Sequence, residues 1–147
     1  MTDGGFQKVD QSDNLLYGPR KLLLCGFAAE VQPKFISLLD MIDLSAIPLV
    51  WVTEDQADIH VGELVQLENG AGSGASSKLP RAIIMSGISQ NELHTLMGGC
   101  RKSGMQPPLW ATLTPASETW PLANLLKELA AEHEAMKKRR QQGSGKE

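Results

Sequence analysis

The 147-residue chain lacks the features that mark several large classes of protein. It has only two cysteines, Cys25 and Cys100, without a CxxC pair or a neighbouring histidine, so no disulfide framework is indicated. No apolar run is long enough to span a bilayer. The net charge of -3 argues against a dedicated nucleic-acid binder, which would carry a strong basic face.

Nucleotide-binding and catalytic motifs are missing as well. The single glycines Gly26 and Gly87 belong to neither GxGxxG nor GxxxxGK[ST]. Ser86, in "MSG", lacks the first glycine of a nucleophile elbow. The three histidines have no spacing suited to a shared metal. Without a complete set of catalytic groups, the sequence favours a non-catalytic function and predicts no cofactor and no metal.

The first residues give an expectation about the compartment. "MTDGGFQKVDQSDNLLYGPR" lacks the charged start and the hydrophobic core of a secretory signal. Few cysteines suit a reducing compartment. We therefore expect a cytoplasmic protein, or a protein of the chloroplast stroma if a transit peptide has been removed.

What the chain does contain is a regular alternation of buried strands and amphipathic helices. Short apolar runs rich in β-branched or aromatic residues predict strands, and apolar residues at helical spacing follow each of them. "SQNE", from Ser89 to Glu92, is a capping box that marks a helix start, and Gly104 is placed to end that helix. The four predicted strands are Lys21–Phe27, Ala46–Thr53, Arg81–Gly87 and Pro108–Thr114.

The two halves of the chain resemble each other. "KLLLCGFAAE" parallels "RAIIMSGISQNE", and "PLVWVTEDQ" parallels "PLWATLTPA", at an offset close to 60 residues. A β-α-β-α unit therefore occurs twice, joined by "NGAGSGASSK" (residues 69–78), which has the composition of a flexible linker. We predict one domain over residues 19–136, flanked by disordered segments at 1–18 and 137–147.

This pattern predicts an α/β fold, a four-stranded, mainly parallel sheet covered by helices on both faces. Right-handed crossovers favour the strand order 2-1-3-4, with a pseudo-twofold axis between the halves. A crevice is then expected beyond the carboxyl ends of strands 1 and 3, where Gly26, Phe27, Gly87 and Ser89 would face one another. A ferredoxin-like α+β sandwich is the alternative.

The stretch "TLTPASETW" is the most distinctive turn of the chain. Pro115 prevents the fourth strand from continuing, and Trp120 stands at a helix entry. Such a ring either staples the turn to the helix or, if it is exposed, anchors a partner. Thr114, Pro115 and Trp120 are therefore the leading candidate binding residues.

The run from "LPRAIIMSGISQNELHTLM" to "TPASETWPLANLLKEL" resembles an uncharacterised domain family found in bacteria and in photosynthetic eukaryotes. The matching motif is a Thr-Pro pair, a Trp and "LLxEL", here Thr114, Pro115, Trp120 and the range 125–129. The first half resembles the upstream region of that family, so the resemblance extends from Lys21 to Met136. It implies no activity, cofactor or partner.

Two functions remain open. The first is a protein-interaction module, of the assembly or regulatory kind, that uses the Thr-Pro-Trp turn. The alternative is a domain that binds a small ligand or an anion in the predicted crevice. Nucleic acid is a partner only if the basic run Lys137, Lys138, Arg139 and Arg140 binds it, since cations at a helix end also serve the helix dipole.

Overall fold

The computed structural model describes residues 14–146, and side chains as far as residue 139. The chain forms an α/β domain, as predicted. Its elements in order are β2 (Lys21–Cys25), α1 (Gln32–Met41), β3 (Leu49–Val52), η2 (Glu54–Gln56), α2 (Val61–Leu64), β4 (Ala82–Ser86), α3 (Gln90–Ser103), β5 (Leu109–Thr112), η3 (Ser117–Thr119) and α4 (Leu122–Lys146).

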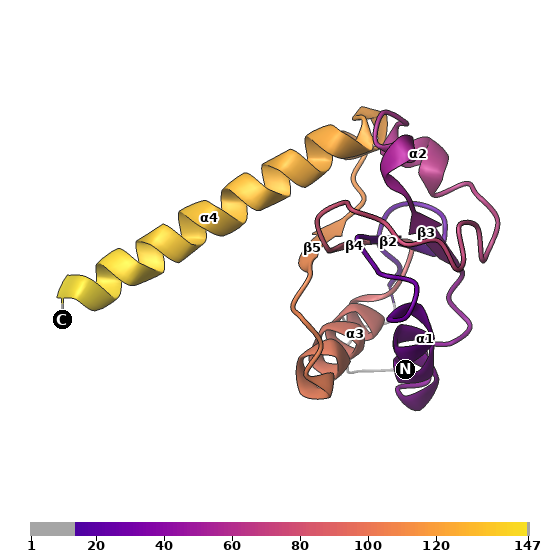
Figure 1. Ribbon diagram of the computed structural model, residues 1–147, viewed down its shortest axis with the longest axis horizontal. Helices are drawn as coiled ribbons and strands as arrows, with labels where there is room; N and C mark the ends of the chain where they lie inside the picture. The colour runs from indigo at the N-terminus through magenta and orange to yellow at the C-terminus, as the bar shows by residue number, and fades with distance from the viewer. Residues whose placement is uncertain (1–13, 147) are drawn as a thin grey trace, which may run out of the picture.

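The sheet has four strands in the order β3-β2-β4-β5, which is the predicted order. Strands β2 and β3 are parallel, and so are β4 and β5, but the central pair β2 and β4 is antiparallel. The sheet is therefore mixed, and the expectation of a mainly parallel sheet holds only within each half. Helices cover both faces (Figure 1), whereas a ferredoxin-like sandwich has helices on one face, so that alternative is wrong.

Alternation along the strands builds two cores, one on each face of the sheet. Leu22 and Leu24 belong to the core under α1 and α3, while Leu23 and Cys25 belong to the core under α2 and the start of α4. Both faces of the sheet are apolar because both are covered by helices. Residues from both halves of the chain are buried in these cores, among them Leu23, Cys25, Ile83, Met85, Leu96 and Leu126.

The halves are related by a twofold axis that runs through the middle of the sheet. Equivalent residues differ by 61 positions, as Gly26 and Gly87 do, and both of these glycines have positive φ. The backbone N–H of Val61 donates to Trp120, and the N–H of Leu122, 61 positions after Val61, donates to Ile59. These bonds are reciprocal, so the short helix α2 and the start of α4 meet at the axis.

The antiparallel central pair overturns the predicted crevice. Cys25, at the carboxyl end of β2, is paired with Ala82, at the amino end of β4. Lys21, at the opposite end, is paired with Ser86. Gly26 and Gly87 therefore leave the sheet at opposite ends, and the two loops that were expected to face each other across one crevice do not meet.

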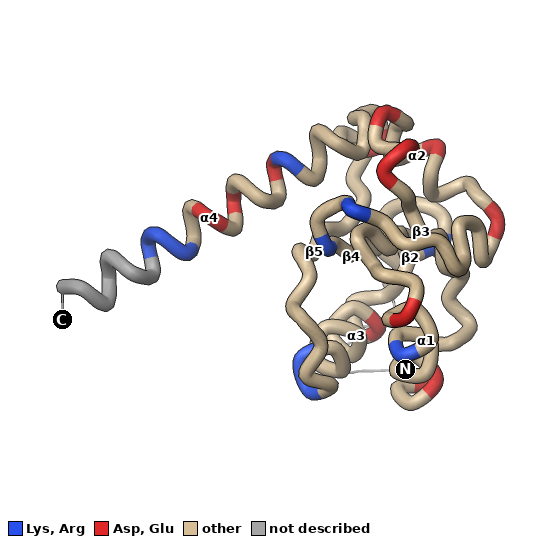
Figure 2. Tube along the Cα trace, viewed as in Figure 1, with Lys and Arg blue, Asp and Glu red and all other residues tan. Residues whose placement is uncertain are grey.

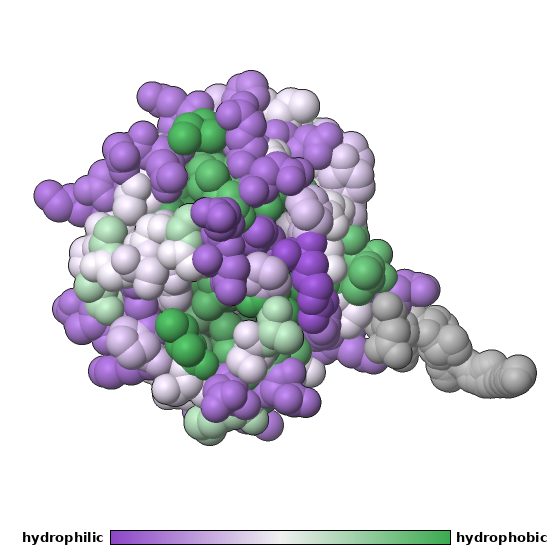
Figure 3. Space-filling model, turned by 90° about the vertical axis from the view of Figure 1, so that its right-hand side faces the viewer, coloured by the Kyte–Doolittle hydropathy of each residue, from purple (hydrophilic) through white to green (hydrophobic). Residues whose placement is uncertain are grey.

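The predicted linker at residues 69–78 is held to the domain by hydrogen bonds. The Trp51 N–H donates to the carbonyl of Ala71 at 2.8 Å, and the Gly74 N–H donates to the side chain of Gln32 at 2.7 Å. The segment runs along the outer edge of β3, the side seen in Figure 3, where apolar residues surface in small patches among polar ones. The segment predicted as a flexible linker therefore makes specific contacts with β3 and α1.

The structure describes parts of both flanking segments. Leu15 forms a β-bridge with Ser89, and Gly87 donates its N–H to the carbonyl of Tyr17, so residues 14–18 lie on the domain. Helix α4 continues to Lys146 through most of the tail that was expected to be disordered. Residues 1–13 and 147 lie outside the described residues. Within residues 14–146, none of the helices combines the length and apolarity that a bilayer crossing requires.

Candidate functional site

The Thr-Pro-Trp turn is organised by its own hydrogen bonds. The Ser117 N–H donates to Thr114 Oγ1, and the Thr114 N–H donates to Ser117 Oγ, both at 3.0 Å. The equivalent turn of the first half uses Thr53 and Gln56 in a capping box. The turn is therefore a repeated structural unit that directs the chain from an outer strand to the twofold axis.

Trp120 contributes its backbone to the fold and its side chain to the surface. Its backbone carbonyl accepts the Val61 N–H, which ties the start of α4 to α2. Its side chain is 36% exposed and lines shallow hollows together with Asn124, Glu128 and Thr114. Thr114 and Pro115 are also exposed. The ring is thus available at the surface, while the backbone of the same residue holds the fold.

Gly26 and Phe27 have packing roles. Phe27 is 2% exposed, and its ring meets the rings of Phe35 at 5.3 Å and Trp51 at 5.8 Å in edge-to-face geometry. The guanidinium of Arg81 lies 4.7 Å from the centre of the Phe27 ring. A Cβ at Gly26 would overlap the carbonyl oxygen of Leu79, and φ is +76° there. The close approach of two backbones explains the glycine.

Ser89 caps α3, and the chain fills the place where an anion was expected. Ser89 Oγ accepts the Glu92 N–H at 3.1 Å, and Glu92 Oε1 accepts the Ser89 N–H at 2.9 Å. Arg20 donates two hydrogen bonds to the Glu92 carboxylate, at 2.8 and 2.6 Å. The Arg20 bonds lower the pKa of Glu92 to about 2. The Glu92 carboxylate therefore occupies the helix N-terminus, where an external anion would bind. Nearby, Gly87 lies close to the backbone of Gly18, where a side chain would not fit.

Both cysteines are free thiols buried in the domain. Burial raises the pKa of Cys25 to about 12 and that of Cys100 to about 11, so neither is a ready thiolate. Glu54 accepts the backbone N–H of Lys78 at 2.9 Å. Among the residues that the structure describes, no group of three or more His, Cys, Asp or Glu side chains could hold a metal ion.

The outer edge of β5 offers free hydrogen-bonding groups. Leu109 and Leu113 donate their N–H groups to Arg81 and Met85 across the sheet, both at 2.9 Å. Because a parallel strand turns alternate residues to opposite sides, the N–H and C=O groups of Trp110 and Thr112 point away from β4. Within residues 14–146, β5 has β4 as its one partner strand, so these groups stay unpaired.

A groove follows this edge beneath α4. One hollow of about 240 Å³ lies between Thr112 and the helix, and a second of about 270 Å³ lies between Trp110 and the helix. Both hollows are lined by Leu129 and Glu132, so they form one continuous surface that we call the β5–α4 groove. Its other lining residues are Pro108, Leu109, Ala111, Thr114, Ala116, Ser117, Trp120, Leu125, Glu128, His133 and Met136.

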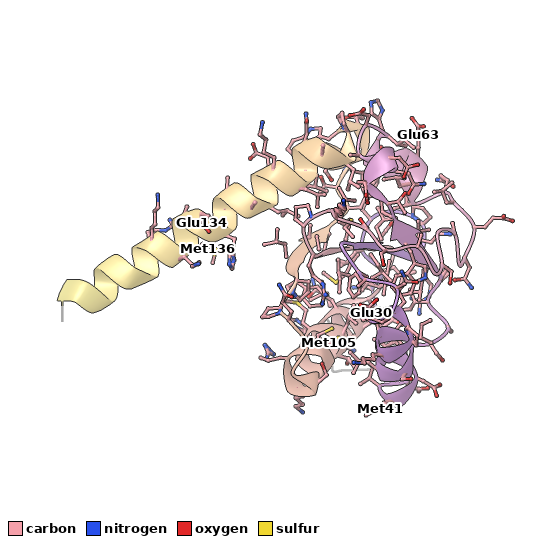
Figure 4. All side chains as sticks on the ribbon, viewed as in Figure 1. Glu30, Met41, Glu63, Met105, Glu134 and Met136 are labelled. Atoms are coloured by element: carbon pink, nitrogen blue, oxygen red, sulfur yellow. The ribbon has the colours of Figure 1, made fainter. Side chains whose placement is uncertain are left out.

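The outer wall of this groove extends far beyond the domain. Leu122, Leu125 and Leu126 of α4 are buried, whereas every residue from Ala130 to Arg139 is exposed. The helix from residue 130 to 146 is about 25 Å long at 1.5 Å per residue. It projects past β5 with Glu134 clear of the domain (Figures 1 and 4), while Met136, which is 52% exposed, still lines the groove with Pro108 and Trp110.

Sequence reasoning selected one end of this groove and missed the rest. Thr114, Pro115 and Trp120 lie at or beside its upper end, and the edge of β5 was not considered. One signal was present: the run "WAT" (Trp110–Thr112) is less apolar than the central strands and follows two prolines, as suits an outer strand. The side on which the edge stays open depends on tertiary structure.

Comparison with known proteins identifies a domain of unknown function in this part of the chain. Residues 81–136 match the model of the DUF3783 family, a domain of unknown function. The predicted resemblance to an uncharacterised family is therefore confirmed for the second half, and the match does not extend to the first half. No curated protein and no solved structure matches the chain. The matched segment contains β4, α3, β5, η3 and the groove-lining part of α4.

Proposed function

We propose that the protein is a non-catalytic interaction module, of the assembly or regulatory kind, that binds an extended segment of a partner protein along β5. The partner segment adds a fifth strand to the sheet and lies beneath α4. Backbone hydrogen bonds to Trp110 and Thr112 supply affinity, and side chains of the segment enter the β5–α4 groove. Trp120 borders the upper end of the groove and adds an exposed aromatic contact.

The supporting observation lies in the other half of the same molecule. By the 61-residue offset, Thr112 corresponds to Trp51, whose N–H is bonded to Ala71 of the edge-covering segment. Trp110 corresponds to Leu49, whose N–H is bonded to the side chain of Asn69 at 2.9 Å. One edge of the sheet thus already pairs with a returning segment of chain, through a β-bridge at Ala71 between two turns, and the equivalent edge has no such segment among the described residues.

The test uses a change that removes the outward donor and leaves the hydrogen bonds to β4 in place. Thr112→Pro eliminates the N–H that points away from β4, and proline is tolerated on an outer strand for that reason. Thr112→Val keeps the N–H and the β-branched shape, so it is the matched control. Both variants should unfold within a few degrees of the wild type, since neither removes a bond to β4.

Binding is measured in two steps. Affinity purification from native extract, followed by mass spectrometry, compares the wild type, Thr112→Val and Thr112→Pro. A captured protein is then purified and its direct binding measured, with amide exchange read at Trp110 and Thr112. We expect a partner that binds the wild type and Thr112→Val but not Thr112→Pro, and that slows exchange at both amides. Partners that bind all three proteins equally would refute the proposal.

Trp120→Ala separates the two roles of the ring. The backbone bonds of this residue do not depend on its side chain, so we expect the free energy of unfolding to fall by about 1 kcal/mol. Partner affinity should fall about tenfold, because a tryptophan that a partner covers is among the residues whose truncation costs most binding energy. A loss of several kcal/mol in stability with unchanged binding would assign the ring to the fold alone.

A further inference from the structure

The wall that α4 contributes to the β5–α4 groove carries two unpaired carboxylates. Glu128 and Glu132 lie one helical turn apart, and both line the groove. Neither forms an ion pair with any described side chain. Like charges at this spacing repel each other, so a cation placed between them would be favourable. They stand directly beside the open edge of β5.

The nearby cations of α4 do not neutralise this pair. Lys127 adjoins Glu128 in sequence but lines a separate hollow with Trp120 and Asn124. The basic residues after Met136, the last described residue to line the groove, lie toward the free end of the helix (Figure 2). The groove is therefore acidic along its length, while the free end of α4 is basic.

The opposite face of the same edge is apolar. A cavity of about 230 Å³ opens there between the end of α3 and the start of β5. Its lining includes Met97, Met105 and Trp110, with Arg101 as its charged residue. Unbranched thioether side chains adapt to apolar groups of varied shape. A cation on this face would meet Arg101, and an apolar side chain would meet methionine and tryptophan.

An added strand presents its side chains to these two faces in turn, because successive residues of a strand point to opposite sides. We infer that the segment bound at β5 alternates Lys or Arg with apolar residues. The basic residues face Glu128 and Glu132, and the apolar residues face Met97, Met105 and Trp110. This inference rests on the proposed function and specifies the chemistry of its partner.

The experiment is a selection from a library of random nine-residue linear peptides displayed on phage, with the full chain as bait. Selection on the wild type runs beside selection on Thr112→Pro, and sequences recovered from both are discarded. The remaining peptides are synthesised with a fluorophore, and their dissociation constants are measured by fluorescence polarisation. The variants are the double substitution Glu128→Gln/Glu132→Gln and the control Glu134→Gln.

The control makes the same chemical change on the same helix. Glu134 lies outside the lining of the β5–α4 groove. Glutamine and glutamate have similar helix propensities, so both proteins keep α4 intact, which circular dichroism verifies. Peptides with Lys or Arg at alternate positions should bind the double variant about tenfold more weakly than the wild type. Each exposed ion pair contributes at most about fivefold to affinity, and the double variant removes two of them. Glu134→Gln should bind within twofold of the wild type.

The outcomes separate the two proposals. Edge-dependent peptides without alternating basic residues, or peptides indifferent to the double variant, would overturn this inference and leave the proposed function standing. A selection that yields no peptide dependent on the Thr112 N–H would count against both. Edge-dependent peptides with the alternating pattern, weakened by the double variant and by salt, support both.

Discussion

The two outer edges of the sheet are equivalent by the internal twofold axis, but the chain completes them differently. At β3, the segment after α2 returns and hydrogen-bonds to the outward groups of Leu49 and Trp51. At β5, the helix after the equivalent turn is α4, which runs outward past the strand (Figure 1). The first half therefore pairs the outward backbone groups of β3 with its own chain. In the second half α4 lies over the edge of β5, but the outward backbone groups of β5 have no partner among the described residues.

This difference shows that one structural unit can serve two purposes, depending on the helix that comes after its turn. The strands, turns and axis contacts are shared by both halves. The helix after each turn differs: α2 has four residues and α4 has 25. Unpaired strand edges are a hazard for aggregation, and short strands, prolines and covering helices limit it. Pro107 and Pro108 before β5 and α4 beside it fit that pattern.

The largest expected effect concerns the docked part of α4. Leu126→Ala should lower the free energy of unfolding by about 2–5 kcal/mol, because it empties a buried position. Met136→Ala, on the projecting part, should change it by less than about 0.5 kcal/mol. Urea unfolding measures both. Equal effects at the two positions would break the distinction between a docked and a projecting segment of the helix.

The second prediction tests the closed edge. A Cβ at Gly72 would overlap the carbonyl oxygen of Trp51, while a Cβ at Gly74 would meet nothing within 4 Å, and both residues have positive φ. Gly74→Ala therefore carries only backbone strain, about 1 kcal/mol. Gly72→Ala adds a displacement of the covering segment, for a total of about 2–3 kcal/mol. If chemical denaturation gives equal losses for the two variants, the segment does not rest on β3 as described.

Amide hydrogen exchange compares the edges without mutation. The Trp51 N–H is bonded to Ala71, whereas its counterpart at Thr112 faces outward without a partner among the described residues. After correction for intrinsic rates, Thr112 should exchange at least about tenfold faster than Trp51. NMR on a dilute sample provides both rates. Strong protection of Thr112 in the free protein would mean that the β5 edge is already occupied.

The smallest effect compares the helices that cover one face of the sheet. Helix α3 begins at a capping box with Glu92, while α1 has no side-chain cap. The folded-state pKa of Glu92, about 2, lies below its ordinary value near 4.5. The stabilisation is therefore present above about pH 4.5 and is lost as the pH falls toward 2.

Replacement by glutamine checks this origin. Glu92→Gln should cost about 1 kcal/mol at pH 7, a modest value because Arg20 is partly exposed. The variant and the wild type should converge in stability between pH 4.5 and 2. A constant difference across that range, measured by thermal unfolding, would show that the ionised Glu92–Arg20 pair is not responsible.

The fold was predictable where the relevant signal is local. Apolar runs identified the four strands, "SQNE" identified the start of α3, and the repeated pattern gave the strand order. The antiparallel central pair was missed although a twofold axis through a sheet requires it, because the halves were treated as one parallel series. The hydrogen bonds of residues 69–78 were missed because a Gly- and Ser-rich composition indicates a low propensity for helix or strand, but it does not indicate whether the segment makes tertiary contacts.

The candidate site was less predictable for a related reason. Thr114, Pro115 and Trp120 are conspicuous in sequence, and they border the groove. The groove itself depends on the direction of α4 and on the backbone N–H and C=O groups of Trp110 and Thr112, which point away from β4. Both are set by packing between elements far apart in the chain. At Ser89, which belongs to the alternative anion-binding hypothesis, Arg20 from a distant part of the sequence holds the Glu92 carboxylate at the helix N-terminus.

The twofold axis also governs the order in which the domain can be completed. Pairing of β2 with β3, and of β4 with β5, closes only the short loop of one crossover, whereas Leu23 and Ile84 at the centre of the sheet are 61 positions apart. Until the second half is synthesised, β2 keeps an open inner edge that is apolar from Leu22 to Cys25. The interior is geometrically an isologous interface between two units that one chain happens to connect. That connection raises the local concentration of the partner half, so we expect chains to exchange halves only when they refold at a protein concentration that exceeds this local value.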